Sequence, residues 1–378
     1  MTYLDHNATS PLRPEAAAAV ARALAIGGNA SSVHGAGRAA RAMVEEAREQ
    51  VAALAGARAN EVIFTSGGTE ANWLALNGAI QGAADAGTRI TRLFVSAIEH
   101  DSVVANAVAL AERVPGLRMD IIPVSTDGVI DARALFEMLR EGKGRALIAA
   151  MAANNETGVI QPIEEISRVA KDANALLLVD VVQAAGKMPL PQADYLTFSA
   201  HKQGAPQGIG ALIVNEAAPF AGQILGGGQE KSRRAGTENV SGIAGFGAAS
   251  AARSDMNRIA ALRDHFEAEL KRVANGAIVF GAKAPRLANT SNFALPGISA
   301  ETGVMALDLD GVMISSGAAC SSGKVRPSTV LKAMGVSDEI AKCALRISFG
   351  WNSLHADVDA AIASISKLVS RARSRQAA

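Results

Sequence analysis

The chain has 378 residues, of which 49% are apolar and 19% charged, and its formal net charge at pH 7 is +1. That length allows a large domain with a sizeable core and a smaller second domain. Because the charges nearly cancel and are spread along the chain, the sequence excludes a basic nucleic-acid-binding surface and favours a small-molecule ligand. Two cysteines, Cys320 and Cys343, are too few for a disulfide framework and suit a reducing compartment. With no secretion signal and no apolar stretch near the roughly 20 residues that span a bilayer, we expect a soluble, cytoplasmic protein.

Helical and strand patterns alternate from about residue 14 to residue 245. Two helices are predicted first, over residues 14–25 and 38–56, and the apolar run that begins at residue 61 leads into a third helix near Thr69. Further strand-like runs cover residues 92–100, 118–124, 145–154, 175–183, 195–201 and 210–215. Apolar strands that alternate with helices predict an α/β domain built on a mainly parallel sheet.

The pattern changes after residue 239. One long helical stretch is expected from about Asn239 to Ala274, followed by short strands over residues 277–282 and 291–297 and by a last amphipathic helix from about Ala356 to Arg375. This mixture predicts a smaller α+β domain. We place the large domain at residues 12–248 and the small domain at residues 249–378 together with residues 1–11.

Polar residues follow five predicted strands, at the sheet edge where α/β proteins bind ligands. The stretch SGGTE, residues 66–70, opens a helix whose free amides can bind a phosphate. The other residues at strand ends are His100, Asn154 to Glu156, Asp180 with Gln183, and His201 with Lys202. Each alone has an ordinary explanation as a cap, a turn residue or a buried histidine, but the five together predict one binding site.

Lys202 suggests the ligand of that site. A lysine at the end of a buried strand is costly unless its amine reaches solvent, is paired, or is deprotonated for chemistry. Pyridoxal 5'-phosphate combines the groups that these residues would bind, because its aldehyde forms a Schiff base with a lysine and an aspartate partners its pyridinium nitrogen. The residues therefore favour this cofactor.

The chain resembles the cysteine desulfurases, within the class V aminotransferase group of the fold-type I pyridoxal-phosphate enzymes. The motifs that carry the resemblance are YLDHNAT, GNASSVHGAGR, FTSGGTEANWLAL, EHDSV, NNETGVIQPI, VDVVQAAGK, SAHKQGAPQGIGAL, GGGQEKSRRAGTENV, SSGAACSSG and ALRISFG. The resemblance implies an α/β fold with a large domain on a mainly parallel seven-stranded sheet and a smaller α+β domain. It also implies a homodimer and pyridoxal 5'-phosphate as the cofactor, with no resident metal.

Carried over position by position, the resemblance implies a role for each site residue. Lys202 would hold the cofactor covalently, Asp180 would pair with the pyridinium nitrogen, Gln183 would bond the phenolic oxygen, and His100 would stack on the ring. The phosphate would be held by Gly68, Thr69, Ser199 and His201, with Thr237 supplied by the second subunit. The substrate carboxylate would be bound by Arg346, and the pocket completed by Asn155, which also touches the cofactor, and by Asn29 and Asn7.

Two residues, Ala30 and Trp73, depart from those usual in the family. These departures affect only the expected shape of the entrance and the fit of one helix, and neither residue belongs to the catalytic set.

Cys320 carries the desulfurase assignment. It lies among Ser, Gly and Ala residues, with no large apolar neighbour in the sequence, and a reactive thiol needs such access. A small buried residue in a tight turn is the alternative for this cysteine. The length of the segment resembles the first of the two desulfurase groups, in which the cysteine travels to the cofactor. Cys343, within the apolar stretch IAKCALRIS, is expected in the core.

The reaction implied is conversion of L-cysteine to L-alanine, with Lys202 taking the Cα proton, the Cys320 thiolate taking the sulfur, and His100 shuttling a proton. The resulting persulfide would pass to an iron-sulfur scaffold or a sulfur carrier, for iron-sulfur cluster or nitrogenase cofactor assembly, with transient cluster ligation at Cys320 as a further possibility. Alternatives are a selenocysteine lyase, another class V aminotransferase activity, and a non-catalytic scaffold that docks through its basic last helix.

Overall fold

The structure is a computed structural model that describes residues 1–317 and 328–376. In these residues the largest sheet has seven strands, in the order β2-β8-β7-β6-β5-β3-β4. The strands are β2 (Val62–Thr65), β3 (Ile90–Ser96), β4 (Arg118–Ile122), β5 (Arg145–Met151), β6 (Leu176–Asp180), β7 (Tyr195–Ser199) and β8 (Gly210–Val214). Only β8 runs antiparallel to its neighbours in this described sheet. The predicted mainly parallel seven-stranded sheet is confirmed.

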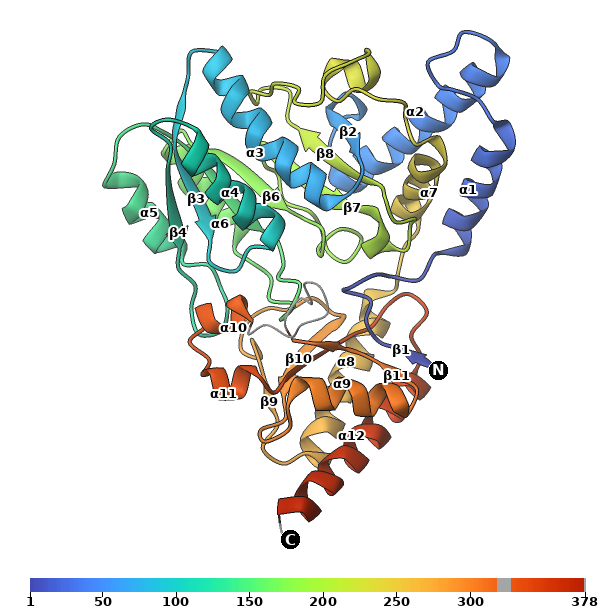
Figure 1. The fold of residues 1–378 in the computed structure, drawn as a ribbon, viewed down its shortest axis with the longest axis vertical. Coiled ribbons are helices and arrows are strands. Elements are labelled where there is room, and N and C mark those ends of the chain that lie inside the picture. Colours follow the sequence, from blue (N-terminus) through green and yellow to red (C-terminus); the bar gives the residue numbers. More distant parts are fainter. Residues whose placement is uncertain (318–327, 377–378) are drawn as a thin grey trace.

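Helices cover both faces of this sheet (Figure 1). They are α2 (Gly35–Ala55), α3 (Gly68–Asp85), α4 (Asp101–Arg113), α5 (Ala132–Arg140), α6 (Ile163–Asp172) and α7 (Val240–Ala251), and α1 (Pro14–Ile26) packs on α7 and α2. Along β6, Leu177 and Val179 join the core with α2, α5, α6 and α7, whereas Leu176 and Leu178 join the core with α3 and α4. Because successive strand residues point to opposite faces, this alternation buries β6 completely and fixes its register.

A second, smaller body lies below the large sheet in Figure 1. In its described residues a four-stranded sheet has the order β12-β13-β10-β9, and a two-stranded sheet pairs β1 with β11. The strands are β1 (Thr2–Tyr3), β9 (Ile278–Val279), β10 (Thr290–Ala294), β11 (Val312–Met313), β12 (Ser315–Ser316) and β13 (Ala344–Ser348). The helices are α8 (Met256–Val273), α9 (Ala300–Leu309), α10 (Thr329–Ala333), α11 (Asp338–Ala341) and α12 (His355–Gln376).

The core of this body joins residues from both ends of the chain. Phe266 of α8 packs against Phe293 and Phe349, with ring centroids 5.4 and 6.4 Å apart. Leu4 is fully buried in the same core, and β1 pairs in parallel with β11. Residues 2–4 are therefore packed with the C-terminal third of the chain, although the exact domain boundary stays a prediction.

The single helix predicted from Asn239 to Ala274 is wrong, since the structure has two helices there. Ala252 is extended after α7, and the Asp255 side chain accepts from the amides of Asn257 and Arg258 to start α8. An aspartate cap satisfies amides that would otherwise have no partner, so it begins a new helix. The last helix is confirmed as α12. Among the described residues, no helix combines the length and the apolar character that crossing a bilayer requires.

Candidate active site

A cavity of about 880 Å³ lies where the carboxyl ends of the large-sheet strands face the smaller body. The predicted site residues that line it are Asn7, Gly68, Thr69, His100, Asn155, Asp180, Gln183, Ser199, His201, Lys202 and Arg346. They come from the ends of β3, β5, β6 and β7, the start of α3, the N-terminal segment and β13. The strand-end reasoning thus located one common cavity.

One end of the cavity is suited to a phosphate. Gly67 has φ 155° and ψ −177°, a conformation open essentially to glycine alone, and it turns the chain from β2 into α3. The amides of Gly68 and Thr69 begin that helix and so have no intrahelical acceptor. Ser199 packs against Gly68, where an added Cβ would lie 3.2 Å from the serine Cβ. Free amides, a hydroxyl and the positive helix end together fit an anion.

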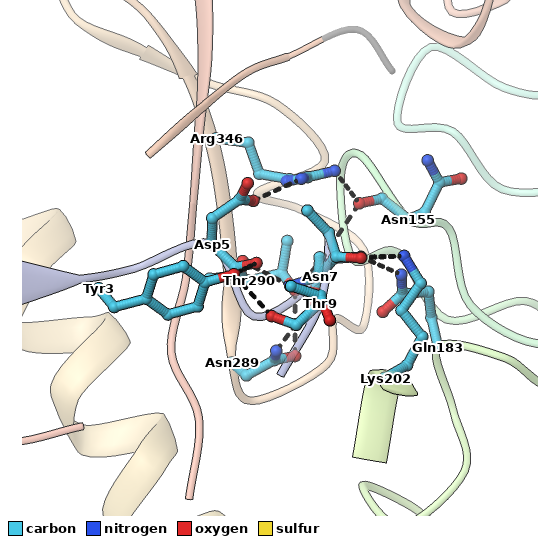
Figure 2. Close-up of polar contacts among 12 residues, drawn as sticks. Tyr3, Asp5, Asn7, Thr9, Asn155, Gln183, Lys202, Asn289, Thr290 and Arg346 are labelled. Carbon is cyan, nitrogen blue, oxygen red and sulfur yellow. Dashed lines mark hydrogen bonds and ion pairs between the residues drawn. The ribbon is translucent and has the colours of Figure 1, made fainter. Parts of the chain in front are cut away.

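Lys202 lies in the turn that follows β7, within the 3-10 segment Ala200–Gln203. Its Nζ donates to the carbonyl oxygens of Asn7 and Ala8, at 2.6 and 2.7 Å (Figure 2). Burial, with a smaller contribution from Arg346, lowers the pKa of Lys202 to about 8. About one tenth of the amine is therefore neutral and able to attack an aldehyde at pH 7, against about one part in 3,000 for an ordinary lysine.

Cofactor uptake is expected to follow this titration. Because only the unprotonated amine attacks an aldehyde, the rate at which the cofactor-free protein takes up pyridoxal phosphate should rise about ten-fold per pH unit below pH 8 and level off above it. Absorbance of the bound cofactor, followed in time across a pH series, measures that rate. An uptake rate that climbs steadily to the ordinary lysine pKa of 10.5 would contradict the depressed pKa of Lys202.

Asp180 ends β6 and accepts two hydrogen bonds. Its Oδ1 accepts from the amide of Val182 and its Oδ2 from Asn72 Nδ2, both at 2.9 Å. Both carboxylate oxygens therefore accept hydrogen bonds, and a carboxylate is the group that pairs with a pyridinium nitrogen. Asn72, in α3, was missed in the sequence because a polar residue inside a helix gives no signal of what it faces.

A second lysine lies beside the cavity. Lys187 Nζ donates to Gln183 Oε1 at 3.0 Å and to Asn7 Oδ1 at 3.4 Å. Burial, together with Lys202 and Arg346, lowers the pKa of Lys187 to about 7. Since a backbone carbonyl only accepts, Gln183 Nε2 donates to Asn7 O at 3.0 Å, which leaves Gln183 Oε1 to accept from Lys187. Its position four residues after Gln183 was the only sequence signal.

Arg346 reaches the cavity from β13. One terminal nitrogen pairs with Asp5 Oδ1 at 2.7 Å and the other donates to Asn155 O at 3.0 Å (Figure 2). Its Nε is buried and has no partner among the described residues. Arg346 lines the cavity, and its planar guanidinium is suited to bind a carboxylate there. Asp5, which also lines the cavity, is a second residue that the sequence did not reveal.

The N-terminal segment connects the two bodies through Asn7. Its side chain donates to Thr290 Oγ1 at 2.9 Å and to Asn155 O at 3.2 Å, and its Oδ1 accepts from Asn289 at 3.0 Å. Both the nitrogen and the oxygen of the Asn7 side-chain amide are therefore already hydrogen-bonded to protein groups. Its predicted contact with the substrate stays a prediction.

Three other predicted residues lie away from the cavity, and a fourth is outside the described residues. Asn29 is exposed and caps its own turn by accepting from Ser31 N, and it does not line the cavity. Thr237 is exposed and lines a separate hollow of about 130 Å³. Cys343 is buried in the large core, as predicted. Cys320 lies outside the described residues.

Known proteins resemble this chain along nearly its full length. Residues 2–361 match the family model of the class V aminotransferases. The chain belongs to the class V aminotransferase family. It is 38% identical over 383 residues to the IscS-like cysteine desulfurase of Mycobacterium tuberculosis, covering 99% of this chain and 97% of that protein. It is 40% identical over 379 residues to a cysteine desulfurase of Cereibacter sphaeroides, covering 98% and 96%.

Solved structures agree with this placement. The NifS-like protein from Rickettsia africae superposes with a TM-score of 0.87 at 34% identity, covering 98% of this chain and 99% of that one. The chain is thus a pyridoxal-phosphate-dependent enzyme of the cysteine desulfurase group. The cavity fits that cofactor, because it offers amide donors at a helix start, the carboxylate of Asp180 and the depressed-pKa amine of Lys202.

Proposed function

We propose that this chain converts L-cysteine to L-alanine and takes up the sulfur as a persulfide on Cys320. The observation that carries the proposal is the cavity itself, which Lys202 and Arg346 both line. Ser316 also lines this cavity and precedes Cys320 by four residues, a spacing that spans at most about 14 Å of extended chain.

Different residues bind the substrate, accept its proton and stabilise the charge on the cofactor. Arg346 binds the substrate carboxylate, and Asp5 and Asn155 hold the guanidinium in place. Lys202, once its amine is free, accepts the Cα proton of the substrate, and Asp180 stabilises the positive charge at the pyridinium nitrogen. The bound cofactor supplies the electron sink for the resulting negative charge.

The sulfur step belongs to Cys320. Its thiolate attacks the sulfur of the substrate, so that an S–S bond forms while the bond from sulfur to Cβ breaks. His100 moves the proton that the departing carbon needs, which leaves alanine and a persulfide. We infer that a scaffold or carrier protein then accepts this sulfur for iron-sulfur cluster or nitrogenase cofactor assembly. Transient cluster ligation at Cys320 and a cytoplasmic location stay predictions.

We also infer that two copies of the chain complete each phosphate site. Thr237 is exposed in this chain and lies outside the cavity, so its predicted phosphate contact requires a second copy. Thr237→Ala is expected to weaken cofactor affinity by about ten-fold, the loss of one charge-assisted hydrogen bond. Equilibrium dialysis of the cofactor against each protein measures this change.

Mixed dimers distinguish a Thr237 that acts in the site of the other subunit from a Thr237 that acts within its own subunit. Unfolding and refolding Thr237→Ala together with Lys202→Ala should restore activity, because one of the two sites in a mixed dimer keeps both residues. No recovery from the mixture, or unchanged cofactor affinity in Thr237→Ala, would show that Thr237 does not cross between subunits.

A further inference from the structure

His100 is the N-cap of α4 and is held there by Ser102. Its Nδ1 accepts from the backbone amide of Ser102 at 3.1 Å and lies 2.8 Å from the Ser102 hydroxyl. A backbone amide can only donate, so Nδ1 carries no proton in this arrangement. In the neutral ring the proton is then on Nε2, the nitrogen that α4 does not hold.

Asn72 determines the direction of the Ser102 hydroxyl. Asn72 Nδ2 donates to Asp180 Oδ2 and to Ser102 Oγ, each at 2.9 Å. The amide cannot be turned over, because a carboxylate accepts and Thr197 Oγ1 occupies Asn72 Oδ1 at 2.6 Å. Since Nδ1 of His100 carries no proton, the bond between Nδ1 and Ser102 Oγ needs the hydroxyl proton, which therefore points to His100.

The donors therefore form one directed chain, from the Asn72 amide through the Ser102 hydroxyl to Nδ1 of His100. Asn72 is 1% exposed and Ser102 is 8% exposed, so water does not compete well for the bond between them, whereas His100 is exposed. Hydrogen bonds in such a chain strengthen one another where the surroundings are apolar. The same amide of Asn72 also binds Asp180, which joins the pyridinium partner and the histidine in one network.

We propose that Ser102, through its amide and its hydroxyl, and Asn72, through that hydroxyl, are positioning residues that keep the proton of His100 on Nε2. The consequence for catalysis rests on the proposed function: a histidine so fixed enters the sulfur step as an N–H donor at Nε2. A ring with its proton on Nδ1 would instead present a lone pair there and could not donate.

His34 provides an internal reference. It is the N-cap of α2, and its Nδ1 accepts from the amide of Gly37 at 3.3 Å. Within the described residues, no hydroxyl adds a second donor to that nitrogen. Removal of the Ser102 hydroxyl should leave His100 with a backbone donor alone, as in His34.

Nitrogen NMR of the holoenzyme, labelled with ¹⁵N at its histidines, tests the proposal directly. The signals of His100 and His34 are assigned by their loss in His100→Gln and His34→Gln. We expect His100 to show an unprotonated Nδ1 and a protonated Nε2. In Ser102→Ala the Nδ1 signal should move towards that of His34, and Ser102→Thr, which keeps the hydroxyl, should restore it. A proton on Nδ1 in the unaltered protein, or no movement in Ser102→Ala, would overturn the proposal.

Asn72 is tested in the same spectra. Asn72→Ala should move the Nδ1 signal of His100 in the same direction as Ser102→Ala, and the double variant should move it no further, because both changes break one chain. Shifts that simply add would overturn the role of Asn72.

Kinetics give the second readout. Ser102→Ala is expected to lower kcat for L-cysteine about five-fold, the loss of one net hydrogen bond, with KM nearly unchanged. A kcat equal to that of the unaltered enzyme would overturn the catalytic consequence. The NMR result does not depend on turnover, so it separates a failure of this proposal from a failure of the proposed reaction.

Discussion

Lys202→Ala is expected to abolish covalent attachment of the cofactor and to lower turnover of L-cysteine by at least about 10³-fold, since one residue supplies both the attachment and the proton transfer. Among the described residues Lys202 is the lysine that lines the cavity, and its pKa of about 8 leaves neutral amine available. Borohydride reduction followed by peptide mapping locates the attachment, and an alanine assay gives the rate.

Lys187→Ala is the matched control. Lys187 is also buried, and its pKa is lowered to about 7, so a depressed pKa alone does not separate the two lysines. Geometry separates them, because Lys187 is absent from the lining of the main cavity and is bonded to Gln183 and Asn7. The control should retain the borohydride-fixed cofactor on Lys202. Fixation that persists in Lys202→Ala but disappears in Lys187→Ala would refute the assignment.

Cys320→Ser is expected to reduce sulfide release from L-cysteine by at least about 10²-fold while the cofactor spectrum is kept, because a hydroxyl replaces the nucleophilic thiolate. Parallel alanine and sulfide assays in the presence of a reducing thiol measure this loss. Selenocysteine turnover should be less affected, because selenium can leave without attack by a thiol.

Cys343→Ser is the control for the loss of a cysteine as such. Cys343 is buried against the core and its Sγ lies 3.5 Å from Glu339 O, so this change is expected to lower the free energy of unfolding by about 1 kcal/mol and to leave sulfur transfer unaffected.

The same assays separate the alternative functions. An aminotransferase would stall without a keto acid, and a non-catalytic scaffold would form no alanine. Undiminished sulfide release from Cys320→Ser would contradict the persulfide step.

The sequence predicted the strand-end residues well because a parallel sheet collects the ends of its strands at one edge. Asp180, His100 and Lys202 come from three different strand ends and line one cavity in the structure. Their order along the chain and the apolar runs before them were sufficient to place them.

The residues that hold this set in position could not be predicted in the same way. Asn72 lies within α3, Ser102 within α4, and Asp5 in the N-terminal segment, and each meets its partner only through the tertiary fold. The break between α7 and α8 was missed although Asp255 is a good helix cap, because the helical pattern on both sides is continuous. Thr237 was placed by the family resemblance, and a single chain does not bring it to the cavity.

The most direct test of the central claim is to find the sulfur after one turnover. The holoenzyme is mixed with one equivalent of L-cysteine without any reducing thiol, and its thiols and persulfides are then alkylated. The protein is digested, and the masses of its peptides are measured by mass spectrometry. We predict one added sulfur on the peptide that contains Cys320, one equivalent of alanine, and an unmodified Cys343 peptide. Alanine formed with no added sulfur at Cys320, or with the sulfur on Cys343, would contradict the account.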